Sequence, residues 1–175
     1  TDLQLASLLL KSAKERGVAG MYFYRPLLVG LLQRLLSDRP RLQRLLDQGE
    51  TGVALTQALD RAVAEALGEQ PIPDRPLAVR LLMLDPQLQH RREVVEQLLL
   101  PRSEAGLQIL VVQGLSARGF EGAAELLLAR WNSLTPAVRR EAFQAIAGRR
   151  DWIAGLVTRL ESGEVAAGEL DAAQR

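Results

Sequence analysis

Apolar residues recur along this chain with the three- and four-residue spacing of one face of a helix. In residues 53–67 they stand at Leu55, Leu59, Ala62, Val63 and Ala66. Positions three or four apart lie on the same side of an α-helix, so this spacing predicts an amphipathic helix. Three earlier stripes follow the same rule: Leu5, Leu8 and Leu9 within residues 2–16; Leu27, Leu28, Leu31, Leu32, Leu35 and Leu36; and Leu42, Leu45 and Leu46.

Helix-breaking residues separate these stripes. Pro26 predicts a helix start, because proline fits the first turn of a helix but not its interior. The aromatic-rich stretch MYFYR at 21–25 then falls in a turn region, either as an exposed partner site or as buried cover of a first repeat. Residues 37–40 predict a further break, and residues 48–52 predict a loop.

The segment from Gly68 to Pro76 contains three prolines. We expect it to be the longest irregular connection and the boundary between an N-terminal helical part, residues 1–70, and a more regular part, residues 71–175. Short helices in the second part alternate with turns near Asp85-Pro86, Pro101-Arg102, Arg118-Gly119, Asn132-Ser133 and Gly148-Arg149. Such short connections favour antiparallel neighbours.

These later helices also resemble one another. Leu107 aligns with Val138, and the same offset relates Val111 to Ala142 and Leu115 to Ile146. The sequence EQLL at 96–99 aligns with ELLL at 125–128 at nearly the same offset. A period near 30 made of two helices is typical of an α-solenoid, in which each helix pair buries its apolar stripe against the next.

The stretch WNSLTPAVRREAF at 131–143 marks the turn inside one such repeat. Thr135 is placed to cap the next helix, and Pro136 at its first position lacks the N–H that would go unpaired there. Leu134 is expected to pack back across the cap. The buried stripe is then predicted at Val138, Ala142, Phe143 and Ile146, with Arg139, Arg140 and Gln144 outside.

Composition agrees with an all-α fold. Leucine accounts for 35 residues, whereas isoleucine and valine together number 16 and aromatic residues seven. Leucine keeps its rotamer freedom in a helix and β-branched residues lose it. We therefore predict an all-α protein, a HEAT- or armadillo-like solenoid of roughly eight to ten antiparallel helices.

Charge and cysteine content narrow the possible functions. The 22 basic and 21 acidic residues nearly balance, so no overall field attracts DNA or an anionic membrane. The chain has no cysteine, which excludes disulfides, thiolate metal sites and a cysteine nucleophile. No apolar run approaches the roughly 18–20 residues that span a bilayer, so we expect no membrane insertion.

No constellation of residues predicts a catalytic or metal site. His90 is the single histidine, and only Glu93 stands near it at a metal-binding spacing, so a solvated histidine is the interpretation we favour. Neither a G-x-S-x-G motif nor a glycine-rich phosphate loop is present. We accordingly predict no catalytic, cofactor-binding or metal residue, no cofactor in this chain and no small-molecule substrate.

Paired arginines and two tryptophans are the remaining candidates for binding. Arg91-Arg92, Arg139-Arg140 and Arg149-Arg150 could contact phosphates from one edge of a solenoid, but an acidic neighbour follows each pair and favours a solvated surface. Trp131 and Trp152 fit either interface anchors or, as we prefer, covers of the seam between helix pairs.

The C-terminal half resembles the HEAT-like region of the large haem-binding proteins of planctomycete- and verrucomicrobia-type bacteria. The features that carry the resemblance are LLLARW at 126–131, SLTPAVRREA at 133–142, Arg-Asp-Trp at 150–152, and LVTRLESGEV with GELDAAQR over 156–175. Those proteins join a propeller domain, described as membrane-bound or glucose-dehydrogenase-like, to HEAT-type repeats and a c-type cytochrome domain. The resemblance implies haem only in a separate downstream domain with a CxxCH motif, since this chain has no cysteine.

Together these observations predict a non-enzymatic helical-repeat scaffold that binds protein partners or flanking domains of its own polypeptide. The resemblance further implies a spacer between propeller and cytochrome in an exported redox protein. The chain begins without Met, and we expect it to be a piece of a larger protein. Two alternatives stay open: a nucleic-acid-binding protein similar to HEAT-like DNA glycosylases, which balanced charge disfavours, and a regulatory subunit of another enzyme.

Overall fold

The computed structural model describes residues 5, 8–9, 11–12, 17–47, 49–68, 74–163 and 165. Within these residues the chain forms nine α-helices and two short 3₁₀ helices and contains no strand. The all-α prediction is therefore confirmed. The chain divides into two compact units, Thr1–Leu88 and Gln89–Arg175, which are considered separately below.

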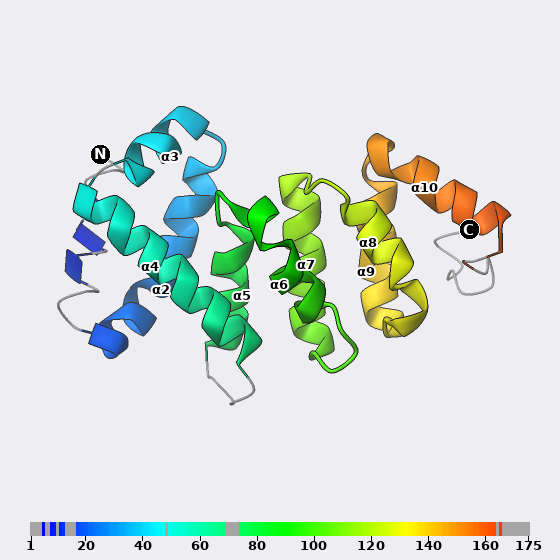
Figure 1. Cartoon of the computed structure of the whole chain (residues 1–175), viewed down its shortest axis with the longest axis horizontal. Helices are drawn as coiled ribbons and strands as arrows, with labels where there is room; N and C mark the ends of the chain where they lie inside the picture. Colours follow the sequence, from blue (N-terminus) through cyan, green and yellow to red (C-terminus); the bar gives the residue numbers. More distant parts are fainter. Residues whose placement is uncertain are drawn as a thin grey trace. The chain divides into compact units, whose positions relative to one another are not determined.

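The helices of the first unit with described bounds (Figure 1) are α2 (Gly17–Leu35), α3 (Arg39–Leu46), α4 (Gly49–Leu67) and α5 (Arg75–Met83). Helix α4 packs against α3 and α5, and α2 packs against the same two helices. The core between them consists mainly of leucine, including Leu32, Leu35, Leu45 and Leu55, each at most 1% exposed. Leu9 is also buried, whereas Leu5 and Leu8 are exposed.

Pro26 does not begin a helix as the sequence predicted. It lies inside α2, which starts nine residues earlier at Gly17. The ring costs about 3 kcal/mol in a helix interior, but Pro26 sits on the exposed side while Leu28, Leu31 and Leu32 on the same helix are buried. Burying each leucine contributes roughly 1.5–3 kcal/mol, which offsets that cost. MYFYR is consequently helical, with Tyr24 half-buried and Arg25 buried.

The predicted loop at 48–52 is also wrong, because α4 begins at Gly49. Gly52 lies in its first turn, and a Cβ added there would overlap the main-chain carbonyl of Leu46 at the end of α3. The glycine that suggested a loop is therefore a packing position, where α3 and α4 approach closely. Gln48 lies outside the described residues.

Helices α4 and α5 remain in one unit although the Gly68–Pro76 segment connects them. Pro76 belongs to the first turn of α5, and residues 69–73 lie outside the described part. The Arg75 side chain crosses this connection, because its Nε donates a hydrogen bond of 3.0 Å to the Ala66 carbonyl near the end of α4. The boundary between the compact units falls after Leu88, so the helix pairs predicted for 71–175 lie in both units.

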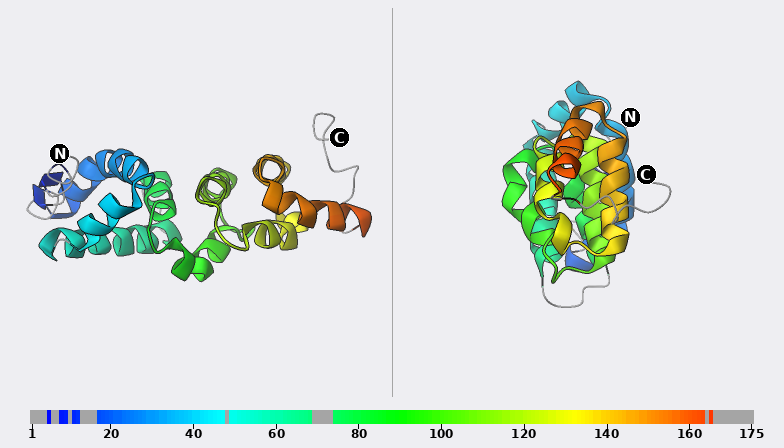
Figure 2. Two further views of the ribbon diagram at one scale, coloured as in Figure 1. Left: turned by 90° about the horizontal axis from the view of Figure 1, so that it is seen from above. Right: turned by 90° about the vertical axis from the view of Figure 1, so that its right-hand side faces the viewer.

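The second unit contains α6 (Arg92–Leu98), α7 (Ala105–Arg118), α8 (Ala123–Ala129), α9 (Pro136–Ala147) and α10 (Arg150–Glu161). A 3₁₀ turn at Leu88–Arg91, η1, precedes α6, and another at Trp131–Ser133, η2, separates α8 from α9. Helix α7 packs against α9, and α8 packs against α10. Figure 2 shows these helices in two layers, with α7 and α9 in one and α6, α8 and α10 in the other.

The repeat offsets agree with this packing. Leu107, Val111 and Leu115 on α7 are buried, and so are their aligned counterparts on α9, Val138, Ala142 and Ile146. Phe143 was expected in the same stripe but is only half-buried, and Arg139 was expected outside but is half-buried as well. The turns predicted near residues 85, 101, 118, 132 and 148 all separate helices.

The cap predicted at Thr135 is confirmed. Its Oγ1 accepts a hydrogen bond of 3.5 Å from the Val138 N–H, and Pro136 follows at the first position of α9. Leu134, next to the cap, is 2% exposed. The Thr-Pro break therefore lies where the chain passes from α8 in one layer to α9 in the other.

Candidate functional site

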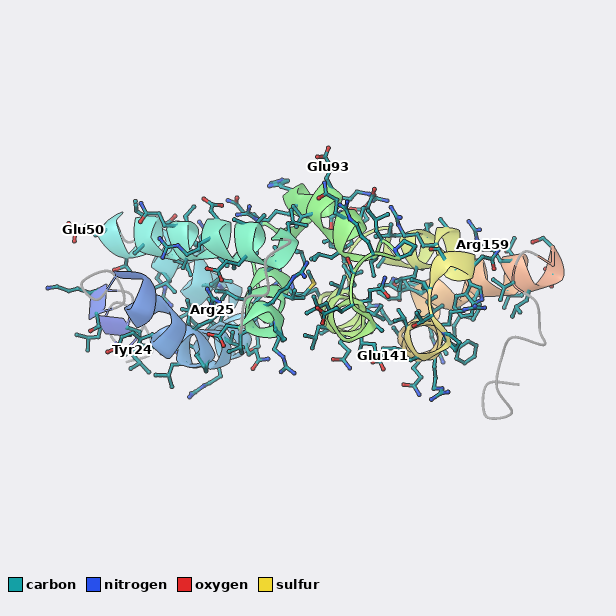
Figure 3. All side chains as sticks on the ribbon, turned by 90° about the horizontal axis from the view of Figure 1, so that it is seen from below. Tyr24, Arg25, Glu50, Glu93, Glu141 and Arg159 are labelled. Carbon is teal, nitrogen blue, oxygen red and sulfur yellow. The ribbon has the colours of Figure 1, made fainter. Side chains whose placement is uncertain are left out.

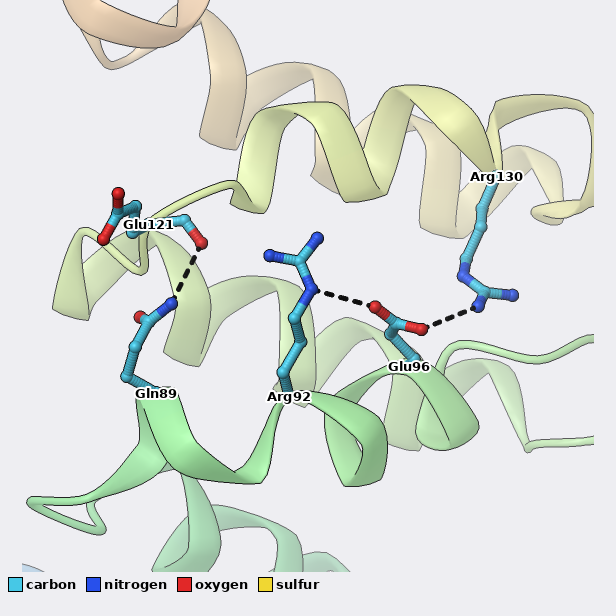
Figure 4. Close-up of polar contacts among 5 residues, drawn as sticks. All are labelled: Gln89, Arg92, Glu96, Glu121 and Arg130. Carbon is cyan, nitrogen blue, oxygen red and sulfur yellow. Dashed lines mark hydrogen bonds and ion pairs between the residues drawn. The ribbon is translucent and has the colours of Figure 1, made fainter.

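The second unit carries a cluster of charged side chains that joins α6 to the end of α8 (Figure 4). Glu96 is its centre: Arg92 Nε lies 3.0 Å from Glu96 Oε1, and Arg130 Nη2 lies 3.8 Å from Glu96 Oε2. Nearby, Gln89 Nε2 donates a hydrogen bond of 3.4 Å to the main-chain carbonyl of Glu121. These contacts tie two helices of one layer together along a surface that solvent reaches.

Two arginines contact the connection between α7 and α8: Arg92, which precedes it in the sequence, and Arg149, which follows it. Gly119 and Gly122 have φ angles of +59° and +74°, which favour glycine. A Cβ at Gly119 would stand 2.9 Å from Arg149 Nη2, and one at Gly122 would stand 2.9 Å from Arg92 Nη1. Each guanidinium therefore rests on glycine backbone about one repeat length away.

Arg149 makes the most contacts of this kind. Its Nη1 donates to the Ser116 carbonyl at 3.3 Å, near the C-terminal end of α7, and its Nη2 lies 3.3 Å from Asp151 Oδ2. Its guanidinium also lies 4.9 Å from the centre of the Trp152 ring. A cation at a helix C-terminus is favoured by the helix dipole, so Arg149 stabilises the contact of the α9–α10 junction with α7.

Two polar residues near the starts of α7 and α9 act alike. Gln108 on α7 is 2% exposed, and its Nε2 donates to the carbonyls of Leu99 and Leu100 at 3.2 and 2.8 Å. Arg139, the aligned residue on α9, donates from Nε to the Leu134 carbonyl at 3.0 Å. Both satisfy carbonyl groups that the preceding connection leaves without a helical partner.

A buried ion pair is the main polar feature of the first unit. Arg25 Nη2 lies 2.6 Å from Glu65 Oε2, with the two side chains 1% and 11% exposed. In Figure 3 Arg25 lies between helices of the first unit, whereas Glu93 on α6 points away from its helix. A buried pair of this kind joins α2 to α4, and removing one partner alone would leave a charge in the core.

The residues that the sequence singled out do not form one site. His90 is exposed in η1. The paired arginines make separate contacts that do not converge on one place, with Arg92 at Glu96, Arg139 at Leu134 and Arg149 at Ser116. Trp131 and Trp152 are 2% and 6% exposed. They therefore serve packing, in agreement with the interpretation we preferred over exposed interface anchors.

Sequence reasoning missed the roles of Glu96, Gln108 and the Arg25–Glu65 pair. Gln108 carried a usable signal, because a glutamine inside an otherwise apolar face must find hydrogen-bond partners once it is buried. The Arg25–Glu65 pair carried none in the local pattern, since its residues belong to helices that are far apart along the chain.

Three further observations bear on chemistry. In the part of the chain that the structure describes, no three His, Asp or Glu side chains gather where a metal ion could bind. No helix among the described residues combines the length and apolarity needed to cross a bilayer. Comparisons with protein-family models, with curated proteins and with solved structures found no match for this chain.

Proposed function

We propose that this chain is a non-enzymatic helical-repeat scaffold, a solenoid of the HEAT type that holds protein partners or flanking segments of its polypeptide in a fixed arrangement. The observation that supports this most is the next-but-one packing in the second unit, of α7 on α9 and of α8 on α10. Stacked helix pairs in which each repeat contacts its neighbours are typical of proteins that present an extended surface for binding.

The polar contacts of the second unit support the same proposal. Arg149, Arg92 and Gln108 each donate to, or rest on, main-chain groups at the helix ends and connections. Contacts of this kind link helices to the connections of neighbouring repeats, and we expect them to keep the spacing of the helices fixed. A scaffold needs such rigidity, and two of the described ion pairs join different helices: Arg25–Glu65 joins α2 to α4, and Glu96–Arg130 joins α6 to the end of α8.

We also propose, from the resemblance of residues 126–175, that the scaffold serves as a spacer between a propeller-type domain and a c-type cytochrome domain in an exported protein. Haem would then bind to a CxxCH motif downstream and not to this chain. Reading the coding sequence on both sides of residues 1–175, followed by haem staining of the longer product, tests this. A neighbouring sequence with no cytochrome domain would contradict the spacer proposal and leave the scaffold proposal standing.

The scaffold proposal itself predicts a rigid second unit. Because the chain has no cysteine, spin labels can be attached at Glu93→Cys on α6 and Thr158→Cys on α10, both exposed positions. Double electron–electron resonance at a concentration where the chain is monomeric should give a single narrow distance distribution that is the same at low and high salt. A broad or multimodal distribution would contradict a fixed spacing.

Nucleic-acid binding is the rival that the same protein can test. A groove that contacts phosphates would show binding that weakens steeply as salt is raised. We expect no binding of a fluorescent duplex even at low salt, because the arginines described above are engaged with protein groups and the chain is nearly neutral. Salt-dependent binding would overturn the assignment as a protein-binding scaffold.

A further inference from the structure

Helix α10 carries an exposed apolar stripe, whereas the corresponding stripes of α6 and α8 are buried. Among the described residues of the second unit, the large apolar side chains that stand exposed are Ile153 and Val157, at 37% and 44%. They are four residues apart and so lie on one face of α10. Trp152 and Leu156, each one residue earlier and so on the adjacent face of the helix, are buried at 6% and 5% exposure.

The repeat pattern shows that this face is one that a helix normally covers. Extending the 29-residue offset that aligns residues 96–99 with 125–128 places Val95 and Ala124 in line with Ile153, and they are 0% and 3% exposed. The same offset places Leu99 and Leu128 in line with Val157, and they are 0% and 4% exposed. Helix α10 itself covers Leu128, whose Cδ1 lies 3.4 Å from the Cβ position of Gly155. The equivalent surface of α10 is thus fitted to receive another helix.

The charged residues at the two ends of the stripe indicate what kind of helix could pack on it. Arg150 and Glu161 are exposed and continue the stripe at spacings of three and four residues from Ile153 and Val157. An arginine at the start of a helix and a glutamate at its end are both disfavoured by the helix dipole. An identical helix running antiparallel would place Glu161 of a second copy beside Arg150, and Arg150 of that copy beside Glu161.

We propose that α10 is a self-association face, on which α10 of a second copy of this chain packs antiparallel. Two-fold symmetry makes such a contact self-complementary. Val157 then meets the exposed small residue Ala154 of the other copy, Ile153 packs beside Thr158, and two Arg150–Glu161 ion pairs flank the apolar centre. One 12-residue helix offers less than the roughly 1,200 Å² of a standard interface, so we expect a weak, reversible dimer.

Sedimentation equilibrium of the full chain from about 10 μM to about 1 mM tests this, a range suited to a weak, reversible dimer. Val157→Glu should abolish self-association, because it places a charge in the apolar centre. Val53→Glu on α4, at a residue that is 58% exposed, is the matched control and should leave the association unchanged. A monomer throughout this range, or equal effects of the two substitutions, would overturn the proposal.

Charge exchange distinguishes an antiparallel second copy from any other cover. Arg150→Glu and Glu161→Arg should each weaken self-association by about tenfold or more, because each places like charges together twice. An equimolar mixture of these two variants should associate as the unsubstituted chain does, since both contacts between unlike copies are again of opposite charge. A mixture no tighter than either variant alone would overturn the pairing of Arg150 with Glu161 and show that another partner covers α10. A parallel pair already places Arg150 beside Arg150 and Glu161 beside Glu161, so single variants that associate no more weakly than the unsubstituted chain would overturn the antiparallel arrangement.

Discussion

The guanidinium of Arg149 lies over the indole ring of Trp152, 4.9 Å from its centre, while the same side chain reaches back 33 residues to the Ser116 carbonyl. One arginine therefore fixes three elements of the second unit. It stacks on Trp152 of α10, stands between the end of α9 and the start of α10, and donates a hydrogen bond to the end of α7. Because of these contacts, we expect Arg149 to contribute more to stability than an arginine at an exposed position.

Arg149→Ala should lower the free energy of unfolding of the second unit by about 1–2 kcal/mol, from the lost stacking and the lost hydrogen bond. Urea titration followed by tryptophan fluorescence measures this unit, because Trp131 and Trp152 are the two tryptophans of the chain and both lie in it. Arg102→Ala, at an exposed position, is the control and should change the free energy by less than about 0.5 kcal/mol. Equal effects would contradict the role assigned to Arg149.

Two glycines of the first unit should respond oppositely to alanine. Gly52→Ala should destabilise the unit by about 3 kcal/mol, because the new Cβ meets main-chain atoms of Leu46 that cannot move without shifting α3. Gly30→Ala has no atom within 4 Å of the new Cβ and should stabilise α2 by about 0.5–1 kcal/mol. Thermal and urea unfolding followed by circular dichroism would measure both; a loop at 48–52 would instead leave Gly52→Ala nearly neutral.

The buried pair of Arg25 and Glu65 should show strong coupling. Glu65→Leu alone is expected to cost about 3–5 kcal/mol, since Arg25 is 1% exposed and loses its carboxylate. The double variant Arg25→Met with Glu65→Leu should recover most of that loss, because an apolar pair has no charge to desolvate. Additive effects in this double-mutant cycle, measured by urea unfolding, would show that the two side chains do not interact.

The cap at Thr135 offers a local test of the break between the layers. Thr135→Ala should cost about 1 kcal/mol, whereas Thr135→Asp should retain most of the stability through the same hydrogen bond to the Val138 N–H. Thr158→Ala inside α10 should cost little, since its hydroxyl bonds to the Ala154 carbonyl of its own helix. Tryptophan fluorescence during urea unfolding again supplies the measurement, and a loss no larger at Thr135 than at Thr158 would argue against the cap.

Local sequence patterns were enough to predict helices and their order in the second unit. The spacing of Leu107, Val111 and Leu115, and the Thr135-Pro136 start, act within a few turns of a helix. Their counterparts in the structure are buried or capped as expected. Short-range rules succeed here because the residues that satisfy them are close together along the chain.

The same rules failed where distant packing decides the outcome. Pro26 remains inside α2 because the buried leucines of that helix outweigh one lost hydrogen bond. Gly52 stands in the first turn of α4 because α3 and α4 approach each other so closely there that a side chain would not fit. The partners of Arg149 and Gln89 stand 33 and 32 residues away. No local pattern specifies such pairs, so these contacts between the helices of the second unit could be found only once the helices were placed in space.

The proposed scaffold depends above all on the stacking of helices in the second unit on their next-but-one neighbours. The most direct measurement is a nuclear Overhauser effect between the Leu128 δ-methyl groups of α8 and the α-protons of Gly155 on α10, in a sample with selectively labelled leucine methyl groups. Stacked helices predict this cross-peak, because Leu128 Cδ1 lies 3.4 Å from the Cβ position of Gly155. Its absence, in a spectrum where contacts of Leu128 within α8 are observed, would contradict the stacked scaffold.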